Sequence, residues 1–230
     1  MKLAIMQPYF LPYLGYFQLI KEVEKYVIYD DVNFFRGYVK RNNMLLNGQS
    51  HLFTLIVLKA SQNKLINEIY LADDQSKLLK TIVLSYKKAP QFSSVLPLIE
   101  KIFGYEDRNL ARFVGNSIMQ IADYLHLVTE FIYSSNIIEK DNSLKAQDKI
   151  LNICKILGAT HYINAIGGRM LYDHKSFEKE KIDLRFLLSN PVQYKQFKNS
   201  FVSHLSILDV LMFNSVEKTN ELLSQYELIQ

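Results

Sequence analysis

Residues 1–31, which read MKLAIMQPYFLPYLGYFQLI followed by KEVEKYVIYDD, constrain the fold most, because they contain a strand, a loop, a helix and a second strand in succession. Residues 2–7 and 26–30 are short apolar runs typical of buried strands, residues 8–14 hold two prolines typical of a loop, and residues 15–25 have helical spacing. In parallel α/β sheets, the end of the first strand and the start of the next helix form a crevice that binds ligands, especially phosphates. We therefore expect a ligand site at the first loop.

The rest of the chain alternates between strand and helix patterns, with one hairpin and one helical block. Asn47-Gly48 favours a tight turn between the β-rich residues 43–46 and 52–58, because both central positions of such a turn need positive φ. Residues 73–125 have helical spacing without a strand signal. The other expected elements are strands at 66–71, 134–138, 161–164 and 182–187, and helices at 142–157, 176–181, 205–213 and 216–226.

This order of elements predicts an α/β protein with a mainly parallel, Rossmann-like sheet, a β-hairpin excursion and a helical insertion. We expect an α/β core domain in residues 1–72 and 134–230, and a helical insertion or subdomain in residues 73–133. A chain of 230 residues is long enough to bury a core of this kind.

Charge and cysteine content favour a cytoplasmic protein with an anionic ligand. The formal net charge is +4 and the lysines are scattered among glutamates, which does not indicate a nucleic-acid-binding surface. Cys154 is the only cysteine, so no intrachain disulfide can form, and its place in an apolar helical phase favours a buried thiol over a nucleophile. Pro8 interrupts the first apolar run and no window reaches about 20 apolar residues, so we expect neither a secretory signal nor a membrane span.

Several blocks of the sequence resemble the WbqC-like family, in the family's order and over nearly the whole chain: IMQPYFLPYLGYFQLI, YDDVNF, RNNMLLNG, LKASQNKLINEI and SHLSILDVLMFN. The family occurs in bacterial gene clusters for O-antigen and other surface polysaccharides. Some of its members are assigned as transferases that place an aminoacyl group, such as glycine, on the amine of an aminodeoxy sugar. The chain departs from the family pattern at Asn43, where a second arginine is common, and at Asn164-Ala165, where Ser-Gly is common.

The first loop is also similar to the first motif of class-I synthetase-type nucleotidyltransferases, in which a loop between strand and helix cradles the phosphates of a nucleotide. Tyr13 and Tyr16 stand where that class prefers histidines. This likeness implies nucleotide binding more than adenylate chemistry.

Gln7, Tyr9, Tyr13, Gly15 and Tyr16 are the leading binding candidates. Gly15 lets a backbone come close to a ligand, and the free amides of the following helix offer partners to an anion. Tyrosines supply stacking faces and hydroxyl donors, and a polar Gln7 at a strand end needs a partner. The alternative is that the prolines stiffen a turn and the tyrosines fill the core.

Asp30, Asp31 and His204 are the catalytic candidates. The two aspartates follow the second strand and should emerge at the same sheet edge as the first loop, where one accepts a sugar hydroxyl or acts as general base towards an amine. Helix capping or a salt bridge is the alternative. His204 precedes an apolar helix and is a candidate for acid/base work, with a capping role as the alternative.

Further binding candidates carry cationic or polar groups that suit a diphosphate or a sugar. A solvated basic face is the alternative for the cations. Asp209 interrupts an apolar helix, where a buried carboxylate needs a partner, and Gly167-Gly168-Arg169 is a weak phosphate-turn signal. No His, Cys or carboxylate cluster has metal-ligand spacing, so no metal is predicted. The candidates of this group are Arg36, Lys40, Arg41, Asn42, Lys59, Asn63, Gln193, Tyr194 and Asp209.

Together these features favour a cytoplasmic transferase that joins an acyl or aminoacyl group to the amine of a nucleotide-linked aminodeoxy sugar. A nucleotide or an acyl or aminoacyl donor is the expected cofactor. The rival interpretation is a non-catalytic module that binds or presents the nucleotide sugar. Aminoacyl-tRNA as donor and a homodimeric assembly are further hypotheses.

Overall fold

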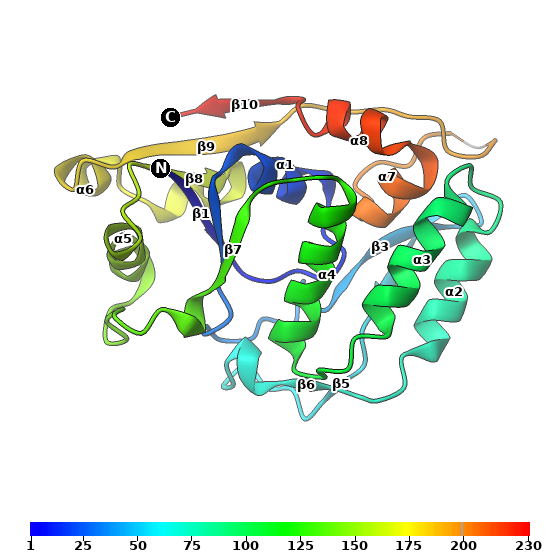
Figure 1. Ribbon diagram of the computed structural model, residues 1–230, viewed down its shortest axis with the longest axis horizontal. Helices are drawn as coiled ribbons and strands as arrows, with labels where there is room; N and C mark the ends of the chain where they lie inside the picture. Colours follow the sequence, from blue (N-terminus) through cyan, green and yellow to red (C-terminus); the bar gives the residue numbers. More distant parts are fainter. Residues whose placement is uncertain (199) are drawn as a thin grey trace.

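A six-stranded sheet forms the centre of the protein in the computed structural model, which describes residues 1–198 and 200–230 (Figure 1). All neighbouring strands are parallel except the pair β9 and β10, so the predicted mainly parallel α/β sheet is confirmed. The strands, in their order across the sheet, are β10 (Tyr226–Ile229), β9 (Asp183–Ser189), β8 (His161–Ala165), β1 (Lys2–Met6), β2 (Lys25–Ile28) and β7 (Glu130–Tyr133).

Helices cover both faces of this sheet because its strands are apolar on both sides. In β1, Leu3 and Ile5 pack into one buried cluster with residues of α5 (Ala146–Ile156) and α6 (His174–Lys179). Ala4, between them, faces the other cluster, which also contains residues of all the remaining α-helices. Those helices are α1 (Leu14–Glu22), α2 (Ser76–Tyr86), α3 (Phe92–Phe103), α4 (Leu110–Tyr124), α7 (Ile207–Phe213) and α8 (Val216–Leu222). The sheet is therefore the middle of three layers.

The hairpin and the helical block lie beside the sheet (Figure 1). β3 (Arg41–Leu46) and β4 (Gln49–Thr54) pair antiparallel, and Asn47 and Gly48 both have positive φ, as predicted for the turn between them. The three helices α2, α3 and α4 occupy the predicted block and share the buried cluster that covers one face of the sheet. The division into separate domains stays a prediction.

Several predicted elements were wrong in type or position. The strand expected at 134–138 is β7, which ends at Tyr133; Ser134–Asn136 is a 3₁₀ helix, η2, because Ser135 turns to hydrogen-bond Asp30. β7 thus lies within the range assigned to the helical insertion. The helix expected at 216–226 ends at Leu222, because the residues after it pair with β9 as β10.

The strand expected at 66–71 splits into the 3₁₀ helix η1 (Ile66–Glu68) and β6 (Tyr70–Leu71), which pairs with β5 (Val57–Leu58). The glycine-bearing segment after β8 forms a third 3₁₀ helix, η3 (Ile166–Leu171), in place of the expected turn.

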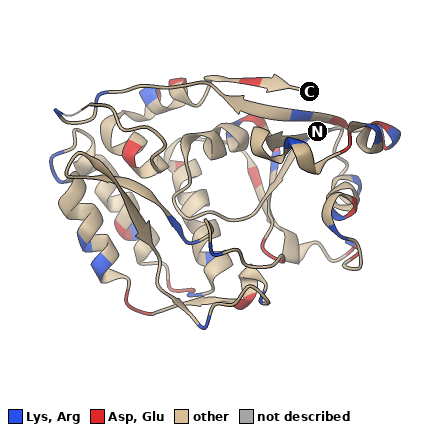
Figure 2. Cartoon of the chain, turned by 180° about the vertical axis from the view of Figure 1, so that it is seen from behind, with Lys and Arg blue, Asp and Glu red and all other residues tan. Residues whose placement is uncertain are grey.

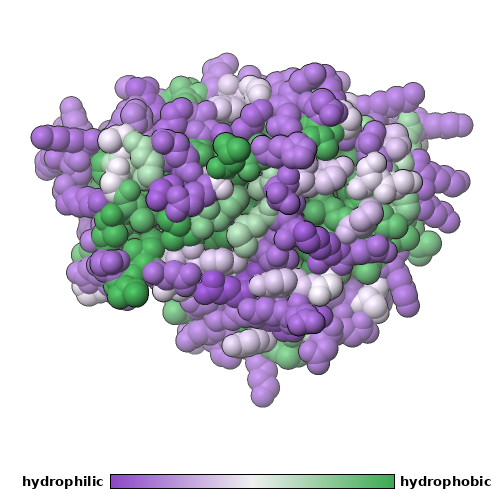
Figure 3. Space-filling view, viewed as in Figure 1, coloured by the Kyte–Doolittle hydropathy of each residue, from purple (hydrophilic) through white to green (hydrophobic). Residues whose placement is uncertain are grey.

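Basic and acidic residues are interspersed along the described part of the chain (Figure 2). On the face shown in Figure 3, polar residues predominate and an apolar patch lies over α5 and the segment before it, where Ile138 is 89% exposed. None of the helices in residues 1–198 and 200–230 is long and apolar enough to cross a membrane.

Candidate functional site

The order of the strands reverses at β1, and a cavity lies at that point. From β1 the chain builds outward through β2 and β7 on one side, whereas β8, β9 and β10 extend the other side. Open α/β sheets bind their ligands outside the carboxyl ends of the strands at such a switch point. The cavity has a volume of about 730 Å³ and is lined by residues that follow β1, β2 and β8 and by the start of α5. Its polar lining residues are Gln7, Tyr9, Tyr13, Tyr16, Tyr29, Tyr38, Gln147, Asn164, Tyr172 and Ser189.

Two tyrosines hold Gln7, the residue directly after β1. The Tyr38 hydroxyl donates to Gln7 Oε1 at 2.5 Å, and the Tyr16 hydroxyl donates to the Gln7 main-chain oxygen at 3.0 Å. The Nε2 group of Gln7 has no acceptor among the described residues, so both of its hydrogens are free for a ligand in the cavity.

The tyrosines of the first loop form an aromatic wall around Tyr9. The centroid of its ring lies 6.3 Å from that of Tyr13, 6.4 Å from Tyr16 and 5.7 Å from Tyr38. Burial raises the pKa of Tyr9 to about 12, and the Arg41 charge opposes that rise only in part. Burial also raises the pKa of Tyr13, Tyr16 and Tyr38. The four hydroxyls are therefore protonated donors at neutral pH and not bases.

Gly15 makes room for this wall at the start of α1. A Cβ at Gly15 would lie 2.8 Å from Tyr13 Cε2, closer than carbon atoms pack, so only glycine leaves the Tyr13 ring in place. No side chain caps the first turn of α1, whose N-cap residue is Tyr13. The free main-chain amides of this first turn of α1 lie beside the cavity, an arrangement that favours an anionic ligand. All five leading binding candidates line the cavity.

The opposite wall comes from β8 and the segment after it. Asn164 is buried and projects from the end of β8, as Gln7 does from β1. A Cβ at Gly168 would lie 3.1 Å from Asn164 Nδ2, so this glycine allows the close packing of the amide. Sequence reasoning gave the glycine pair little weight and missed Asn164 and Tyr172. The signal for Asn164 was the one used for Gln7, a polar residue at the end of an apolar strand.

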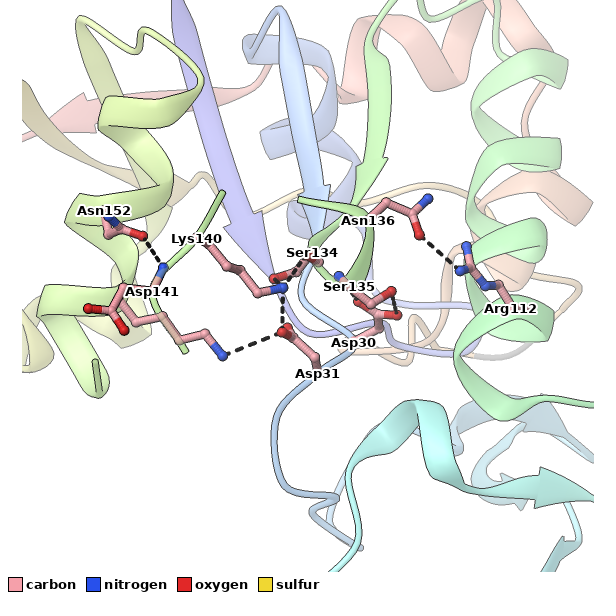
Figure 4. Close-up of polar contacts among 10 residues, drawn as sticks. Asp30, Asp31, Arg112, Ser134, Ser135, Asn136, Lys140, Asp141 and Asn152 are labelled. Carbon is pink, nitrogen blue, oxygen red and sulfur yellow. Dashed lines mark hydrogen bonds and ion pairs between the residues drawn. The ribbon is translucent and has the colours of Figure 1, made fainter. Parts of the chain in front are cut away.

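Asp30 and Asp31 do emerge at the predicted sheet edge, but their carboxylates point away from each other and neither lines the cavity (Figure 4). Asp30 is fully buried and accepts hydrogen bonds from the main-chain nitrogen of Ser135 at 2.9 Å and from its Oγ at 2.6 Å. Asp30 thus ties the end of β2 to η2, and the salt bridge that was the alternative for the two aspartates is made by Asp31.

Asp31 pairs with two lysines. Its Oδ2 lies 2.5 Å from Lys140 Nζ and 3.4 Å from Lys149 Nζ. Burial favours the neutral form of this carboxyl, but hydrogen bonds from Lys140 and Ser134 and the charge of Lys149 outweigh it and lower the pKa. Lys149 Nζ also lies 5.5 Å from the ring of Tyr29, which does line the cavity. The Asp31–Lys149 ion pair therefore packs against Tyr29 on the outer side of the cavity wall.

None of the predicted cations belongs to the lining of the cavity. The pKa of Lys40 is lowered by burial and by the charges of Arg41 and Arg36, which places the three cations close together, and Arg41 also acts on Tyr9. Arg36 donates to the Ala60 oxygen at 3.3 Å, beside the exposed loop that carries Lys59 and Asn63.

Asn42 shapes the first loop without lining the cavity. Its Nδ2 donates to the Leu11 oxygen at 2.7 Å, and Leu11 has a φ of 44° in the left-handed region. This side chain therefore holds the loop in a conformation that a leucine rarely adopts.

Asp209, Tyr194 and His204 lie outside the cavity. Asp209 is buried and accepts hydrogen bonds from Tyr86 at 2.9 Å, Tyr194 at 2.7 Å and Gln196 at 2.6 Å, which ties the loop before α7 to that helix. Burial raises the pKa of this carboxyl. His204 is exposed, and its ring has no hydrogen-bond partner in residues 1–198 and 200–230.

Cys154 and a second hollow lie apart from the cavity. Cys154 is buried, and burial raises the pKa of its thiol to about 12. The second hollow has a volume of about 600 Å³, and Arg169, His174 and Lys181 contribute to its wall. In the described part of the chain, no three His, Cys, Asp or Glu side chains converge as metal ligands do.

Comparison with known proteins gives a family and one distant relative. The sequence model of the WbqC-like protein family matches residues 7–221, nearly the whole chain. The uncharacterized protein Rv1507c of Mycobacterium tuberculosis is 25% identical over 219 residues, which cover 93% of each chain. No solved structure matches the chain.

Proposed function

The chain belongs to the WbqC-like protein family, and from that premise we propose that it is a transferase of bacterial surface-polysaccharide (O-antigen) synthesis. It joins an acyl or aminoacyl group, such as glycyl, to the amine of a nucleotide-linked aminodeoxy sugar. The observation that carries the proposal is the cavity at the carboxyl ends of β1 and β8, with Gln7 and the tyrosines of the family-specific first loop in its wall.

The cavity suits a nucleotide sugar in size and chemistry. Its volume of about 730 Å³ lies in the range of about 300–1,000 Å³ found for small-molecule sites. The tyrosine rings offer stacking faces to a base or sugar, and the free amide of Gln7 offers donors to its oxygens. The charge of Arg41 acts on Tyr9 in the lining, and together with the uncapped start of α1 it suits a diphosphate.

In this proposal the protein acts mainly by holding the two substrates together. A neutral sugar amine is already a nucleophile, so correct placement against an activated acyl group supplies much of the acceleration. The tyrosine hydroxyls stay protonated and bind oxygens of the substrates. Asp30, Asp31 and His204 lie outside the lining of the cavity, so in this proposal the amine proton passes to the leaving group.

The interspersed charges in Figure 2 favour a small activated acyl donor over aminoacyl-tRNA, which would call for a continuous basic surface. The proposed location is the cytoplasm, where nucleotide sugars are made.

A second candidate, a non-catalytic module that presents the nucleotide sugar to another enzyme, is favoured by one observation. Among the described residues that line the cavity, none has a carboxylate, imidazole, thiol or amine side chain. Turnover separates the two candidates: the isolated chain converts a nucleotide aminosugar and an acyl donor to an amide product only if it is the transferase.

The experiment combines calorimetry and mass spectrometry with a panel of nucleotide-linked aminodeoxy sugars. We expect a dissociation constant between about 1 μM and 1 mM, the range of ordinary KM values, for at least one sugar. Gln7→Leu should weaken that binding at least about tenfold, because it removes the free amide, whereas Gln49→Leu, on the exposed start of β4, should not. Absence of binding across the panel would refute the proposal.

A further inference from the structure

Three polar groups at the cavity wall form a closed triangle. Asn164 Nδ2 lies 3.1 Å from the Tyr162 hydroxyl and 3.0 Å from the Tyr172 hydroxyl, and the two hydroxyls are 3.2 Å apart. The amide orientation is settled by Ala165, whose main-chain N–H donates to Asn164 Oδ1 at 2.7 Å. Nδ2 is therefore the atom that faces both tyrosines, and it donates one hydrogen to each.

Counting hydrogens in this triangle leaves one without a partner. Each hydroxyl oxygen already accepts from Asn164, and the two hydroxyls bring one hydrogen each. Only one of these hydrogens can lie between the two oxygens. The other must point to an acceptor outside the triangle, and among the described residues neither hydroxyl has one.

The surroundings decide which hydroxyl keeps the free hydrogen. Tyr162 is completely buried, so a hydrogen that it directed elsewhere would stay unsatisfied, which buried donors avoid. Tyr172 is only partly buried and lines the cavity. Tyr162 therefore donates to Tyr172, and the Tyr172 hydrogen points into the cavity.

We propose that the Tyr172 hydroxyl is a hydrogen-bond donor for the carbonyl oxygen of the transferred acyl group, a role that rests on the proposed acyl transfer. Its oxygen accepts from both Asn164 and Tyr162, and such chains polarise the remaining O–H and strengthen it as a donor. Burial keeps it protonated by raising its pKa. Gly168 belongs to the same arrangement, because a Cβ there would crowd the Asn164 amide at 3.1 Å.

In the reaction, the amine nitrogen of the sugar attacks the carbonyl carbon of an acyl ester or thioester. The carbon–nitrogen bond forms while the carbonyl π electrons move to oxygen, where the Tyr172 O–H binds the negative charge. When those electrons return, the bond from carbon to the oxygen or sulfur of the leaving group breaks. The leaving group departs with that electron pair and takes up the proton that the amine has lost.

The kinetic test compares Tyr172→Phe with Tyr70→Phe. The first removes one hydroxyl but keeps the ring, which packs 5.6 Å from Tyr162 and 5.7 Å from Phe177; the second alters an exposed tyrosine on β6. We expect Tyr172→Phe to lower kcat about 10²- to 10³-fold with KM changed less than about threefold, and Tyr70→Phe to change neither. An unchanged kcat in Tyr172→Phe, or a rise in KM alone, overturns the proposal.

A measurement that needs no substrate separates this inference from the proposed function. Neutron diffraction of the deuterated free protein locates both hydroxyl deuterium atoms. We expect the Tyr162 deuterium to point at Tyr172 and the Tyr172 deuterium to point into the cavity; the reverse arrangement overturns the donor assignment. If the deuterium atoms lie as expected but no nucleotide aminosugar is acylated, the acyl-transfer role is refuted while the donor itself is established.

Discussion

Replacing Gly15 with alanine should weaken ligand binding without lowering stability. The added Cβ would lie 2.8 Å from Tyr13 Cε2, 3.2 Å from Tyr13 Cδ2 and 3.6 Å from Ser189 Cβ. Carbon atoms pack at about 3.5 Å or more, so the Tyr13 ring must move by about 0.7 Å. It can do so, because the ring is 38% exposed.

The effects on stability nearly cancel. Gly15 lies inside α1 and its φ is not positive, so alanine fits the backbone and gains up to about 1 kcal/mol of helix propensity. Forcing Tyr13 off its rotamer costs about 0.5–1.5 kcal/mol. We expect the free energy of unfolding, measured by urea denaturation, to change by less than about 1 kcal/mol.

Binding has no such compensation. The displaced ring loses its edge-on contact with Tyr9, now 6.3 Å between centroids, which is worth about 0.5–1.5 kcal/mol. The dissociation constant of the nucleotide sugar should therefore rise about two- to tenfold in calorimetry. In a Tyr13→Ala background the Gly15→Ala change should have no effect. A similar loss of affinity in both backgrounds, or a drop in stability above about 2 kcal/mol, would refute this reasoning.

Three further predictions concern groups that surround the cavity or support the fold. Asn42→Ala removes the hydrogen bond to the Leu11 oxygen and should cost about 1–3 kcal/mol in urea denaturation, whereas a change below about 0.5 kcal/mol would contradict its role in holding the loop. Burial raises the Asp209 pKa above its ordinary value of 3.8, so the folded state favours the protonated carboxyl. The stability that this group contributes is therefore present at low pH and is lost as pH rises from about 3.8 through the folded pKa. The stability of Asp209→Asn relative to wild type should then increase from pH 3 to pH 7, and a difference independent of pH would argue against it. Cys154 is buried with its thiol pKa raised to about 12, so native protein should resist iodoacetamide at pH 8 while protein in urea is alkylated; rapid native labelling is the contrary result.

Local patterns were sufficient to predict the first wall of the cavity. The apolar run of β1, the prolines after it and the helical spacing of α1 are all contained in neighbouring residues, and the polar residue at the end of the strand, Gln7, marks the site. The second wall depends on β8 lying beside β1, a contact between distant parts of the chain. Asn164 and Tyr172 therefore had no local signal that joined them to the first loop.

Long-range contacts also explain the misplaced details. The edge at which Asp30 emerges follows from topology, but its orientation depends on Ser135, which lies 105 residues further along the chain. β10 forms because the edge strand β9 pairs with the residues after α8, and those four residues, Tyr226–Ile229, have no distinct strand pattern of their own. The hairpin turn was predictable because Asn47-Gly48 sets its own geometry.

The most direct test of the central claim is a crystal structure of the protein with a nucleotide-linked aminodeoxy sugar. We expect the ligand in the cavity between the first loop and η3, with the Gln7 amide donating to its oxygens and the diphosphate towards Arg41. A ligand in the other hollow, beside Arg169 and His174, would contradict the assignment of the site. So would a ligand that binds on the surface and leaves the cavity at the ends of β1 and β8 filled only with water.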